Sequence, residues 1–534
     1  MKNAKIARLS ILILLTAVFF FSCAKSSYNG MWHTANRSSF EIVLSEAVFP
    51  WQEEFEIKEG FDPRNFDHIV ENPFLHAGDY PLSTFSIDVD TAGYSITRKY
   101  LDSGQMPPAS VIRIEELINY FDYEYSAPVD GKPFAVHAEA GYASWNPGHY
   151  LARIAIKGKE FPVTQRPKVN LVFLIDVSGS MDSPSRLPLV IDSMKMLVNE
   201  LNGADRVAIC VYAGNAGTVL PPVSCDEKQK IINALGKLKA GGSTAGGEGI
   251  ELAYKLAGDY YDPQAVNRVI LCTDGDFNVG IRDRGELINL ITEKAKSGVY
   301  LTILGFGMDN FQDGTLKQLA LNGNGNYGYI DTIEEAHKLL VKELSGTLIT
   351  IAKDVKIQVE FNPANTGAYR LIGYENRIMR NEDFSDDEKD AGDIGAGHTV
   401  TAFYEIIPPG AEADALPRRD QLKYGAPEID YISQYADELL TVKIRYKMPA
   451  EDKSELISSP VLMSSIRQRG RESQDFLFAS SVAAFGMMLR DSRYKGNASY
   501  ADVLSMAENS LGADKWGFRR GFTDLVKKAD SIKK

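Results

Sequence analysis

The chain has 534 residues, which is too long for one hydrophobic core and predicts two to four domains. Its composition, with 44% hydrophobic and 24% charged residues, is typical of a soluble globular protein. The formal net charge is −13, and the sequence contains no basic stripe and no RNP-like or zinc-finger pattern. We therefore expect no nucleic-acid partner.

The first 22 residues predict a lipoprotein signal peptide that is not part of the fold. Basic residues precede an apolar run at 11–21, which is too short to span a membrane comfortably. Cys23 follows a small residue in a pattern that resembles a lipobox, with Phe20 where Leu is usual. We therefore expect Cys23 to be acylated, as in bacterial lipoproteins, which anchors a chain without a spanning helix. The alternative is an ordinary secretion signal with an incidental cysteine.

Residues 23–62 predict a tether between this anchor and the folded chain. Its segment 40–49 is too apolar for a free linker and is expected to dock on a domain. Ala24 gives no Asp-type signal for retention in the inner membrane. We therefore expect a lipid-anchored protein of the bacterial cell envelope, at the outer membrane or facing the periplasm rather than in the cytoplasm.

Residues 63–166 predict a small α+β domain. Asp88 and Asp90, at the end of its first strand, suggest a cation site. Capping of the following helix by Asp90 or Thr91 is the favoured alternative. The periodicity predicts strands at 84–89, 134–140 and 150–156, and helices at 92–103 and 112–121.

Residues 167–349 predict a second domain, in which apolar segments alternate with helical ones. The segment 169–175 is almost continuously apolar, as expected of a strand covered on both faces. Strand–helix alternation at this pitch predicts a doubly wound α/β fold with a mainly parallel sheet. Further strands are expected at 206–212, 217–223, 268–272, 300–306 and 327–330, and helices at 187–201, 227–238, 249–260, 284–297, 315–321 and 333–348.

Residues 350–534 predict a third region, β-rich at first and helical at its end. An acidic, Gly-rich stretch at 381–397 is predicted to be a solvated loop. We expect strands at 355–361, 369–373, 398–407 and 439–446, and helices at 475–489 and from 500 onward. Five apolar side chains of helix 475–489 are expected to share one face as domain core: Phe476, Phe478, Val482, Phe485 and Met488.

Five residues of the middle region offer hard oxygen ligands: Asp176, Ser178, Ser180, Thr244 and Asp274. Asp176 ends one strand and Asp274 a later one, so both should reach the edge of a parallel sheet where ligands bind. Hydroxyls and carboxylates, with no Cys or His among them, suit Mg²⁺, Mn²⁺ or Ca²⁺ rather than Zn²⁺. The alternative is a helix cap made by Ser180 or Asp182.

The motifs that carry these residues resemble a known family. IDVSGSM, GGST and LCTDGD are similar to the metal-ion-dependent adhesion site of von Willebrand factor type A (VWA) domains, over roughly residues 168–347. The resemblance implies hydroxyl ligands at Ser178, Ser180 and Thr244. It implies carboxylates at Asp176 and Asp274, acting directly or through water. It also implies Mg²⁺ as the ion, with a position open to an Asp or Glu carboxylate of a protein partner.

The flanking segments resemble a narrower bacterial group. PFLHAGDYPLSTFSIDVDTAGYSITRKYL and the following IRIEELINYFDY are similar to lipoproteins of the YfbK-type group. Members of that group combine a VWA domain with a C-terminal extension similar to residues 350–530. The resemblance therefore implies a domain organisation and says little about mechanism.

Two further patterns concern cysteines and a calcium loop. Three cysteines lie beyond the lipobox: Cys210, Cys225 and Cys272. An odd number without a CxxC pair predicts buried free thiols rather than a disulfide framework. The stretch from Asp274 matches the opening of an EF-hand loop, but Gly285 stands where the twelfth-position Glu is required. Asp276 is therefore expected to order the turn around Asp274.

Catalysis is not expected from the sequence. It contains no Walker A motif, no HExxH and no GxSxG, and none of its seven histidines falls within the metal motif. A role of Asp176 as a phosphoryl acceptor would require a lysine partner, which is not apparent in the sequence. We therefore expect a lipoprotein that binds a protein partner through a divalent cation. A metal-stabilised scaffold in an envelope complex is the alternative, and a metal-dependent hydrolase is the weakest of the three.

Overall fold

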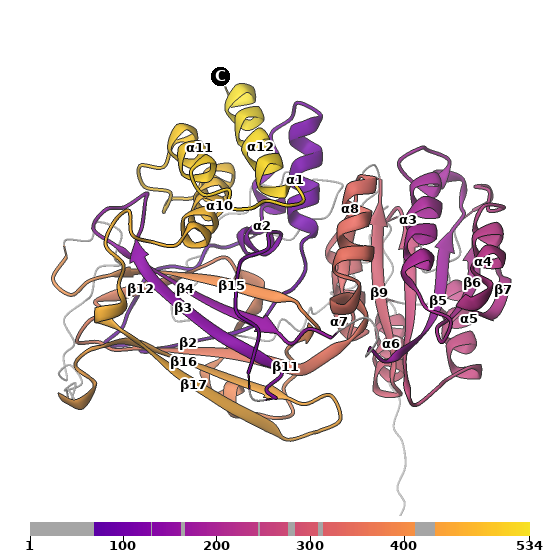
Figure 1. Cartoon of the computed structure of the whole chain (residues 1–534), viewed down its shortest axis with the longest axis horizontal. Helices are drawn as coiled ribbons and strands as arrows, with labels where there is room; N and C mark the ends of the chain where they lie inside the picture. Colours follow the sequence, from indigo (N-terminus) through magenta and orange to yellow (C-terminus); the bar gives the residue numbers. More distant parts are fainter. Residues whose placement is uncertain are drawn as a thin grey trace, which may run out of the picture. The chain divides into compact units, whose positions relative to one another are not determined.

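The computed structural model describes residues 69–129, 131–161, 166–243, 246–275, 284–307, 313–411 and 433–533. The described strands form three sheets (Figure 1). One sheet lies within the middle of the sequence, and the other two combine strands from both ends of the chain. The middle sheet therefore belongs to a domain that is inserted into a second, discontinuous one.

The middle sheet is made of β5 (Lys168–Asp176), β6 (Arg206–Tyr212), β7 (Ala216–Ser224), β8 (Ala265–Thr273), β9 (Val299–Phe306) and β10 (Tyr327–Ile330). Its order is β10-β9-β8-β5-β6-β7, and every pair is parallel except the edge pair β6–β7. β5 is apolar on both faces because it is a central strand covered on both sides. The predicted doubly wound, mainly parallel fold is confirmed.

Helices cover both faces of this sheet (Figure 1). They are α3 (Leu187–Glu200), α4 (Lys228–Leu235), α5 (Gly246–Asp259), α6 (Arg284–Lys296), α7 (Asp313–Asn322) and α8 (Ile333–His337). Successive residues of β5 point to opposite faces. Leu171 and Phe173 pack in the core shared with α3, α4 and α8, whereas Val172 and Leu174 pack in the core shared with α5, α6 and α7. Each such buried side chain contributes about 1.5–3 kcal/mol.

The single helix predicted at 333–348 is interrupted. α8 is followed by a π-helical turn, Lys338–Lys342, and by α9 (Leu344–Leu348). The Glu343 N–H donates to the Lys338 carbonyl, five residues back, and Nζ of the buried Lys338 lies 2.6 Å from Oε1 of Glu343. The wider π-helical turn brings these two side chains together, although they are five residues apart. In an α-helix, side chains three or four residues apart are the ones that lie next to each other.

The other two sheets are antiparallel and take strands from both flanks of the inserted domain. The N-terminal flank supplies β1 (Leu75–His76), β2 (Leu82–Ser86), β3 (Phe134–Tyr142) and β4 (Tyr150–Gly158). The C-terminal flank supplies β11 (Thr350–Phe361), β12 (Ala368–Ile372), β13 (Ile378–Met379), β14 (Gly392–Gly395), β15 (Thr399–Ile407), β16 (Glu438–Lys447) and β17 (Ser454–Leu462). The strand orders are β1-β12-β15-β4-β3 and β13-β2-β11-β16-β17, with β14 paired to β11.

This pairing differs from the predicted division of the flanks into separate domains at 63–166 and 350–534. β2 pairs with β11, so that Phe85 lies opposite Ile357, and β4 pairs with β15. Contacts between strands so far apart leave no local signal in a single sequence, whereas hydrophobic periodicity does reveal the strands themselves. The two flanks therefore fold as one body around the insertion.

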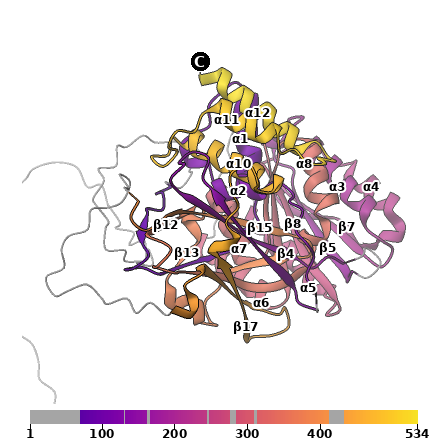
Figure 2. The same ribbon diagram turned by 60° about the vertical axis from the view of Figure 1, so that its left-hand side comes forward.

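Helices from both flanks gather beside the first of these sheets (Figures 1 and 2). They are α1 (Ala92–Asp102), α2 (Ile114–Asn119), α10 (Gln474–Arg490), α11 (Tyr500–Glu508) and α12 (Phe518–Lys533). α10 contacts α2 and α11, and α1 contacts both α12 and β10 of the inserted domain. The apolar side chains predicted as core on α10 are buried. Among the described helices, none is both long enough and apolar enough to cross a bilayer.

The three cysteines of the inserted domain are buried free thiols, as predicted. Cys210 lies on β6 and Cys272 on β8, with β5 between these two strands in the sheet. Their side chains also belong to the cores on opposite faces of the sheet. This arrangement excludes a disulfide between them.

Candidate metal centre

Asp176 and Asp274 lie on neighbouring strand ends at one edge of the middle sheet. Asp176 is the last residue of β5, and Asp274 directly follows β8, which pairs with β5 in parallel. Both residues are buried, at 0% and 1% exposure. The structure thus brings both predicted carboxylate ligands to the carboxyl edge of the sheet, where doubly wound folds bind their ligands.

Asp176 accepts hydrogen bonds at both of its carboxylate oxygens. Oδ1 accepts from the N–H of Ser178 at 2.9 Å, and Oδ2 accepts from the hydroxyls of Tyr212 at 2.9 Å and Thr273 at 3.4 Å. Burial raises the pKa of Asp176 and nearby Asp274 adds to this rise, while the hydrogen bonds from Ser178 and Tyr212 oppose it. A cation at this edge would favour the ionised form of Asp176.

Tyr212 and Thr273 were missed by the sequence reasoning. Each is the last residue of a strand next to β5, and Tyr212 lies in register with Asp176. Their hydroxyls orient the Asp176 carboxylate. In the sequence, each of these residues is a hydroxyl side chain at the last position of a strand. This feature points to the site only when the order of the strands in the sheet is known.

The two predicted serine ligands lie on the turn that follows β5. Ser178 directly precedes a short 3₁₀ turn, Gly179–Met181, which contains Ser180. The two hydroxyl oxygens are 3.0 Å apart. Ser178 is buried and Ser180 is half-buried. The turn therefore brings both hydroxyls together next to the carboxylate of Asp176.

The Gly-rich turn before α5 is hydrogen-bonded to this serine turn. The Gly179 N–H donates to the Gly242 carbonyl at 3.0 Å, and the Gly241 N–H donates to the Val177 carbonyl at 2.7 Å. Thr244, the fifth predicted ligand, lies outside the described residues, and so do Cys23 and Asp276. The described part of the Gly-rich turn thus reaches the loop that carries the serine ligands.

The alternative role of Ser180 or Asp182 as a helix cap is wrong. α3 begins at Leu187, and its N-cap residue is Arg186, which makes no side-chain capping bond. The guanidinium of Arg186 instead donates to the Ser180 carbonyl, and its Nη1 lies 3.2 Å from Oδ2 of Asp274. No motif marks Arg186 in the sequence, because its contact with Asp274 joins distant segments of the chain.

The side chains at this edge fit a hard divalent cation. Asp176, Asp274, Ser178 and Ser180 offer only oxygen atoms, which are the ligands that Mg²⁺ and Ca²⁺ prefer. Within the described ranges, no group of three or more His, Cys, Asp or Glu side chains could hold a metal ion. An ion at this edge therefore depends on the serine hydroxyls as well as on the two carboxylates.

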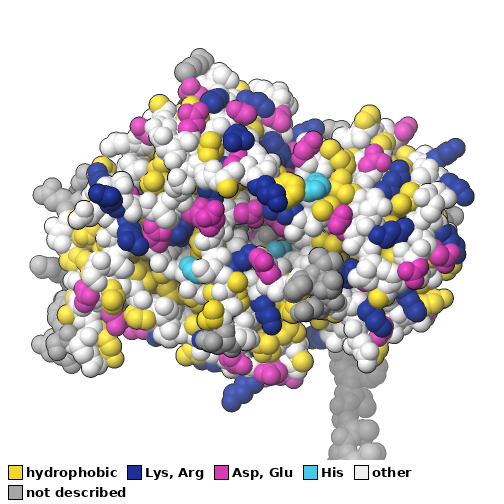
Figure 3. Space-filling view, viewed as in Figure 1, with side chains coloured by type: hydrophobic (Ala, Val, Ile, Leu, Met, Phe, Trp, Pro, Cys, Tyr) yellow, Lys and Arg dark blue, Asp and Glu magenta, His cyan; other side chains and the backbone are white. Residues whose placement is uncertain are grey.

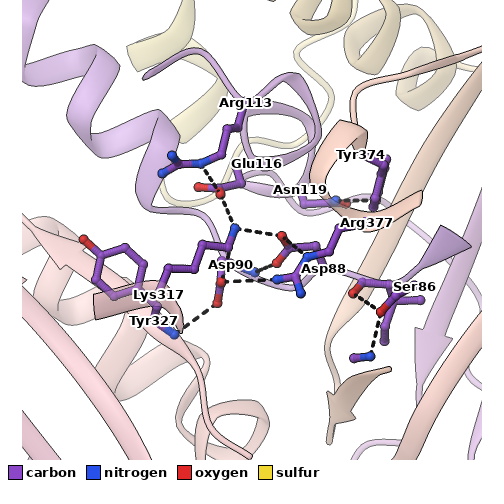
Figure 4. A network of polar contacts seen from close by, with 12 residues as sticks. Ser86, Asp88, Asp90, Arg113, Glu116, Asn119, Lys317, Tyr327, Tyr374 and Arg377 are labelled. Carbon is purple, nitrogen blue, oxygen red and sulfur yellow. Dashed lines mark hydrogen bonds and ion pairs between the residues drawn. The ribbon is translucent and has the colours of Figure 1, made fainter. Parts of the chain in front are cut away.

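The cation site suggested at Asp88 and Asp90 contains a lysine ammonium (Figure 4). Lys317 extends from α7, and its Nζ lies 2.8 Å from Asp88 Oδ2, 3.4 Å from Asp90 Oδ2 and 2.6 Å from Glu116 Oε1. Nε of Arg377 lies 2.9 Å from Asp88 Oδ2. The cation among these carboxylates is thus a side chain of the protein, and we call the group the Lys317 cluster.

The favoured alternative for Asp90 and Thr91, a helix cap, is also wrong. Thr91 is the N-cap residue of α1 but makes no side-chain capping bond. The Gly93 N–H donates instead to Oε2 of Glu116 at 2.6 Å. Oδ1 of Asp90 accepts the N–H of Tyr327 on β10 at 3.0 Å. Asp90 therefore connects the N-terminal flank to the inserted domain.

The Lys317 cluster holds its carboxyl groups in different states. Burial raises the pKa of Asp90 to about 7, and the charges of Asp88 and Glu116 add to the rise. Burial acts in the same direction on Asp88, but Arg377 and Lys317 together hold its pKa well below the usual range. Burial would lower the pKa of Lys317, yet Asp88, Glu116 and Asp90 raise it. The ammonium therefore stays charged in the physiological range.

A cavity of about 670 Å³ lies apart from both clusters, between β3, β4 and the segments around the start of α10 and α12. Four of its charged side chains pair with one another: Arg153 with Glu139 at 2.7 Å, and Arg519 with Asp475 at 2.5 Å. Figure 3 shows acidic and basic side chains mixed around a hollow on one face of the protein. Side chains of both signs therefore line this cavity, and their charge does not indicate a binding site.

Three family models match the chain. A model described as von Willebrand factor type A domain matches residues 170–343, which carry the metal-site loops. A model described as von Willebrand factor matches residues 61–153, and one described as uncharacterized protein YfbK, C-terminal, matches residues 346–532. The inserted domain is therefore a VWA domain. Such domains commonly hold a divalent metal at the adhesion site and mediate interactions between proteins.

The relatives extend this match to most of the chain. It is 41% identical over 477 residues to the uncharacterized protein YfbK of Escherichia coli (strain K12), covering 88% of this chain and 81% of that protein. It is 30% identical over 184 residues to the uncharacterized protein sll0103 of Synechocystis sp., covering 34% and 43%. A solved von Willebrand factor type A structure from Catenulispora acidiphila aligns over 75% and 91% of the two chains, with 16% identity and a TM-score of 0.40. The chain belongs to the YfbK family of VWA-domain proteins.

Proposed function

We propose that this protein binds a partner protein through a divalent cation, Mg²⁺ first among the candidates. The cation would be held by five residues: Asp176, Ser178, Ser180, Thr244 and Asp274. The observation that carries the proposal is the meeting of two buried carboxylates and the serine turn at the carboxyl edge of the VWA sheet. A bound ion would supply a strong local positive charge there. An Asp or Glu carboxylate of the partner is the ligand that such a charge favours.

Cys23 is proposed as the lipid anchor that holds the chain in the bacterial cell envelope, at the outer membrane or facing the periplasm. The signal-peptide pattern of residues 1–22, which ends directly before Cys23, supports this part of the proposal. Cys23→Ser should abolish incorporation of radiolabelled palmitate and move the protein out of the membrane fraction of cells. Full membrane association of Cys23→Ser would contradict the anchor.

The second candidate function is a metal-stabilised scaffold within an envelope complex. It is favoured by the Lys317 cluster, which joins the VWA domain to the flanks, and by the sheets that the two flanks share. In this function the ion would stabilise the protein without contacting a partner. Neither candidate includes a catalytic step.

Metal-dependent capture tests the proposal. Mg²⁺ is titrated into the detergent-extracted, full-length protein by calorimetry, for wild type, Asp176→Ala and Asp192→Ala. Asp192 is the matched control, because its carboxylate on α3 is 63% exposed. Envelope proteins captured by each variant are then compared in Mg²⁺ and in EDTA. Wild type and Asp192→Ala should bind Mg²⁺ and capture a partner, whereas Asp176→Ala should do neither.

The other outcomes separate the remaining functions. Capture that persists in EDTA, or in Asp176→Ala, would sink the adhesion proposal. Mg²⁺ binding without metal-dependent capture would favour the scaffold. Hydrolysis of ATP or of phosphoesters that is lost in Asp176→Ala would indicate a metal-dependent hydrolase instead.

A further inference from the structure

Arg186 places a guanidinium at the edge of the candidate metal centre. It directly precedes α3, and only 8% of its surface is exposed. Its Nη1 donates to the carbonyl of Ser180 and lies 3.2 Å from Oδ2 of Asp274. The same group therefore contacts the main chain of one proposed ligand residue and the carboxylate of another.

Close packing against Gly307 holds the Arg186 side chain in this position. Gly307 directly follows β9 and has a φ of +78°, which favours glycine. A Cβ there would lie 2.5 Å from Nε and 3.0 Å from Cγ of Arg186. The Gly307 carbonyl accepts the hydroxyl hydrogen bond of buried Tyr329 at 2.9 Å, which fixes this stretch of main chain. The position of the guanidinium is thus built into the fold.

The net charge of a loaded site depends on this guanidinium. A divalent ion held by the carboxylates of Asp176 and Asp274 would form a neutral assembly, because hydroxyl ligands carry no charge. The guanidinium of Arg186 adds one positive charge. Charges in a partly buried site interact more strongly than in water, so this excess charge would attract an anion.

We propose that Arg186 makes the metal centre specific for a carboxylate ligand. This inference rests on the proposed function and deepens it: the ion supplies the coordination position, and Arg186 supplies the net charge that one carboxylate neutralises. Because the guanidinium pairs with Asp274 and repels the ion, it weakens binding of the metal alone. Metal and carboxylate therefore bind cooperatively, and each raises the affinity for the other by the same factor.

The experiment uses Mn²⁺ as the metal probe and acetate as the carboxylate probe, on the full-length protein. Free Mn²⁺ is followed by its electron paramagnetic resonance signal, and acetate binding to the Mn²⁺-loaded protein by the relaxation of water protons. Acetamide, which has the same shape and no charge, is the matched ligand control. In wild type, acetate should raise the affinity for Mn²⁺ about five- to tenfold, within the usual range of coupling between sites. Acetamide should not change it.

Three variants locate the effect. Arg186→Gln should bind Mn²⁺ alone about five- to tenfold more tightly and show a weaker coupling to acetate than wild type. Arg186→Lys, which keeps the charge, should retain the coupling. Arg206→Gln removes an exposed arginine at the opposite end of the same sheet and should behave as wild type.

Each of the remaining outcomes would contradict the inference. Arg186→Gln with wild-type Mn²⁺ affinity and coupling would overturn the role of Arg186 and leave the proposed function standing. Equal effects of acetate and acetamide on wild type would overturn it as well, and this measurement needs no variant to fold. A wild-type protein that binds no Mn²⁺ would instead refute the proposed function, and the inference with it.

Discussion

Two clusters of buried carboxylates in this protein look alike in the sequence and differ in the structure. Asp176 and Asp274 stand at strand ends of the VWA sheet, and Asp88 and Asp90 follow β2 in the N-terminal flank. Among the second pair lies the Lys317 ammonium, within 2.8 Å and 3.4 Å of the two carboxylates. The first pair has serine hydroxyls beside it and a guanidinium only at its margin, on Asp274. Acidic residues at a strand end therefore indicate a metal site only where no side chain of the protein already supplies the cation.

The two clusters also connect different parts of the molecule. Lys317 comes from α7 of the VWA domain, whereas its carboxylate partners come from the N-terminal flank and Arg377 from the C-terminal flank (Figure 4). The cluster thus joins the inserted domain to both flanks. The Asp176–Asp274 edge is built within the VWA domain, from β5, β8 and the turns that follow them. One cluster is predicted to set the stability of the whole protein, and the other its response to metal.

Removing the resident cation should have the largest effect. Lys317→Met removes the ammonium that Asp88, Asp90 and Glu116 share, and breaking such a buried group costs about 3–5 kcal/mol of unfolding free energy. Urea denaturation at pH 8 in EDTA measures the loss. Lys255→Met, at an exposed position on α5, is the control and should change stability by less than about 0.5 kcal/mol. A loss below about 1 kcal/mol for Lys317→Met would show that the cluster does not stabilise the fold as argued.

The second largest effect on stability is expected from binding of the divalent ion. A ligand present at one hundred times its Kd stabilises the folded protein by about 2.7 kcal/mol. Wild type should gain this increment in Mg²⁺, and Asp176→Ala should lose it. Lys317→Met should keep the increment even though its baseline stability is lower, because the two clusters are separate. Loss of the Mg²⁺ increment in Lys317→Met would break this distinction between the clusters.

The protonation of Asp90 predicts a dependence on pH. Its folded pKa of about 7 lies above the usual value of 3.8, so the folded state retains a proton that the unfolded state releases. The stability associated with this carboxyl group is therefore full below pH 4 and is lost as the pH rises from about 4 to 7. Asp90→Asn, whose amide oxygen can still accept the Tyr327 N–H, should gain stability relative to wild type over that interval, by about 1.4 kcal/mol for each unit by which the folded pKa exceeds the unfolded one.

Denaturation of Asp90→Asn and wild type at pH 4.5, 6 and 8 checks this prediction. The difference in unfolding free energy should grow from pH 4.5 to pH 8 in favour of the variant. A difference that is constant across these three values would mean that Asp90 titrates normally in the folded protein.

The smallest effect is expected at Thr91. Since Thr91 makes no side-chain capping bond and Glu116 bonds the Gly93 N–H instead, removing the Thr91 hydroxyl should cost little. Thr91→Val should change the unfolding free energy by less than about 0.5 kcal/mol, compared with about 1 kcal/mol for the loss of a working cap. Thermal denaturation in EDTA measures this difference. A loss of a full kilocalorie would restore Thr91 as the cap of α1.

Most of the secondary structure could be predicted from the sequence, and the exceptions have physical causes. The strands β6 and β10 fall at their predicted bounds, because buried strands carry continuous apolar runs. β17 was missed, since it is an edge strand with polar residues and with Pro460, which an edge position tolerates. Four of the predicted ligands lie at the expected edge of the sheet, whereas Tyr212 and Arg186 were not foreseen. Tyr212 reaches the site because β6 lies next to β5 in the sheet. Arg186 reaches it because its long side chain extends to Asp274.

The sequence by itself determined which oxygen-bearing side chains the candidate metal centre offers. An apolar strand that ends in Asp176, followed by two serines, places hard oxygen ligands at a sheet edge through local geometry alone. Only the tertiary structure decided which acidic cluster already holds a cation and how the flanks combine. Lys317 and Arg186 lie far in sequence from the carboxylates that they meet, and the flanking strands pair across the whole inserted domain. Such contacts depend on chain packing, which local periodicity does not encode.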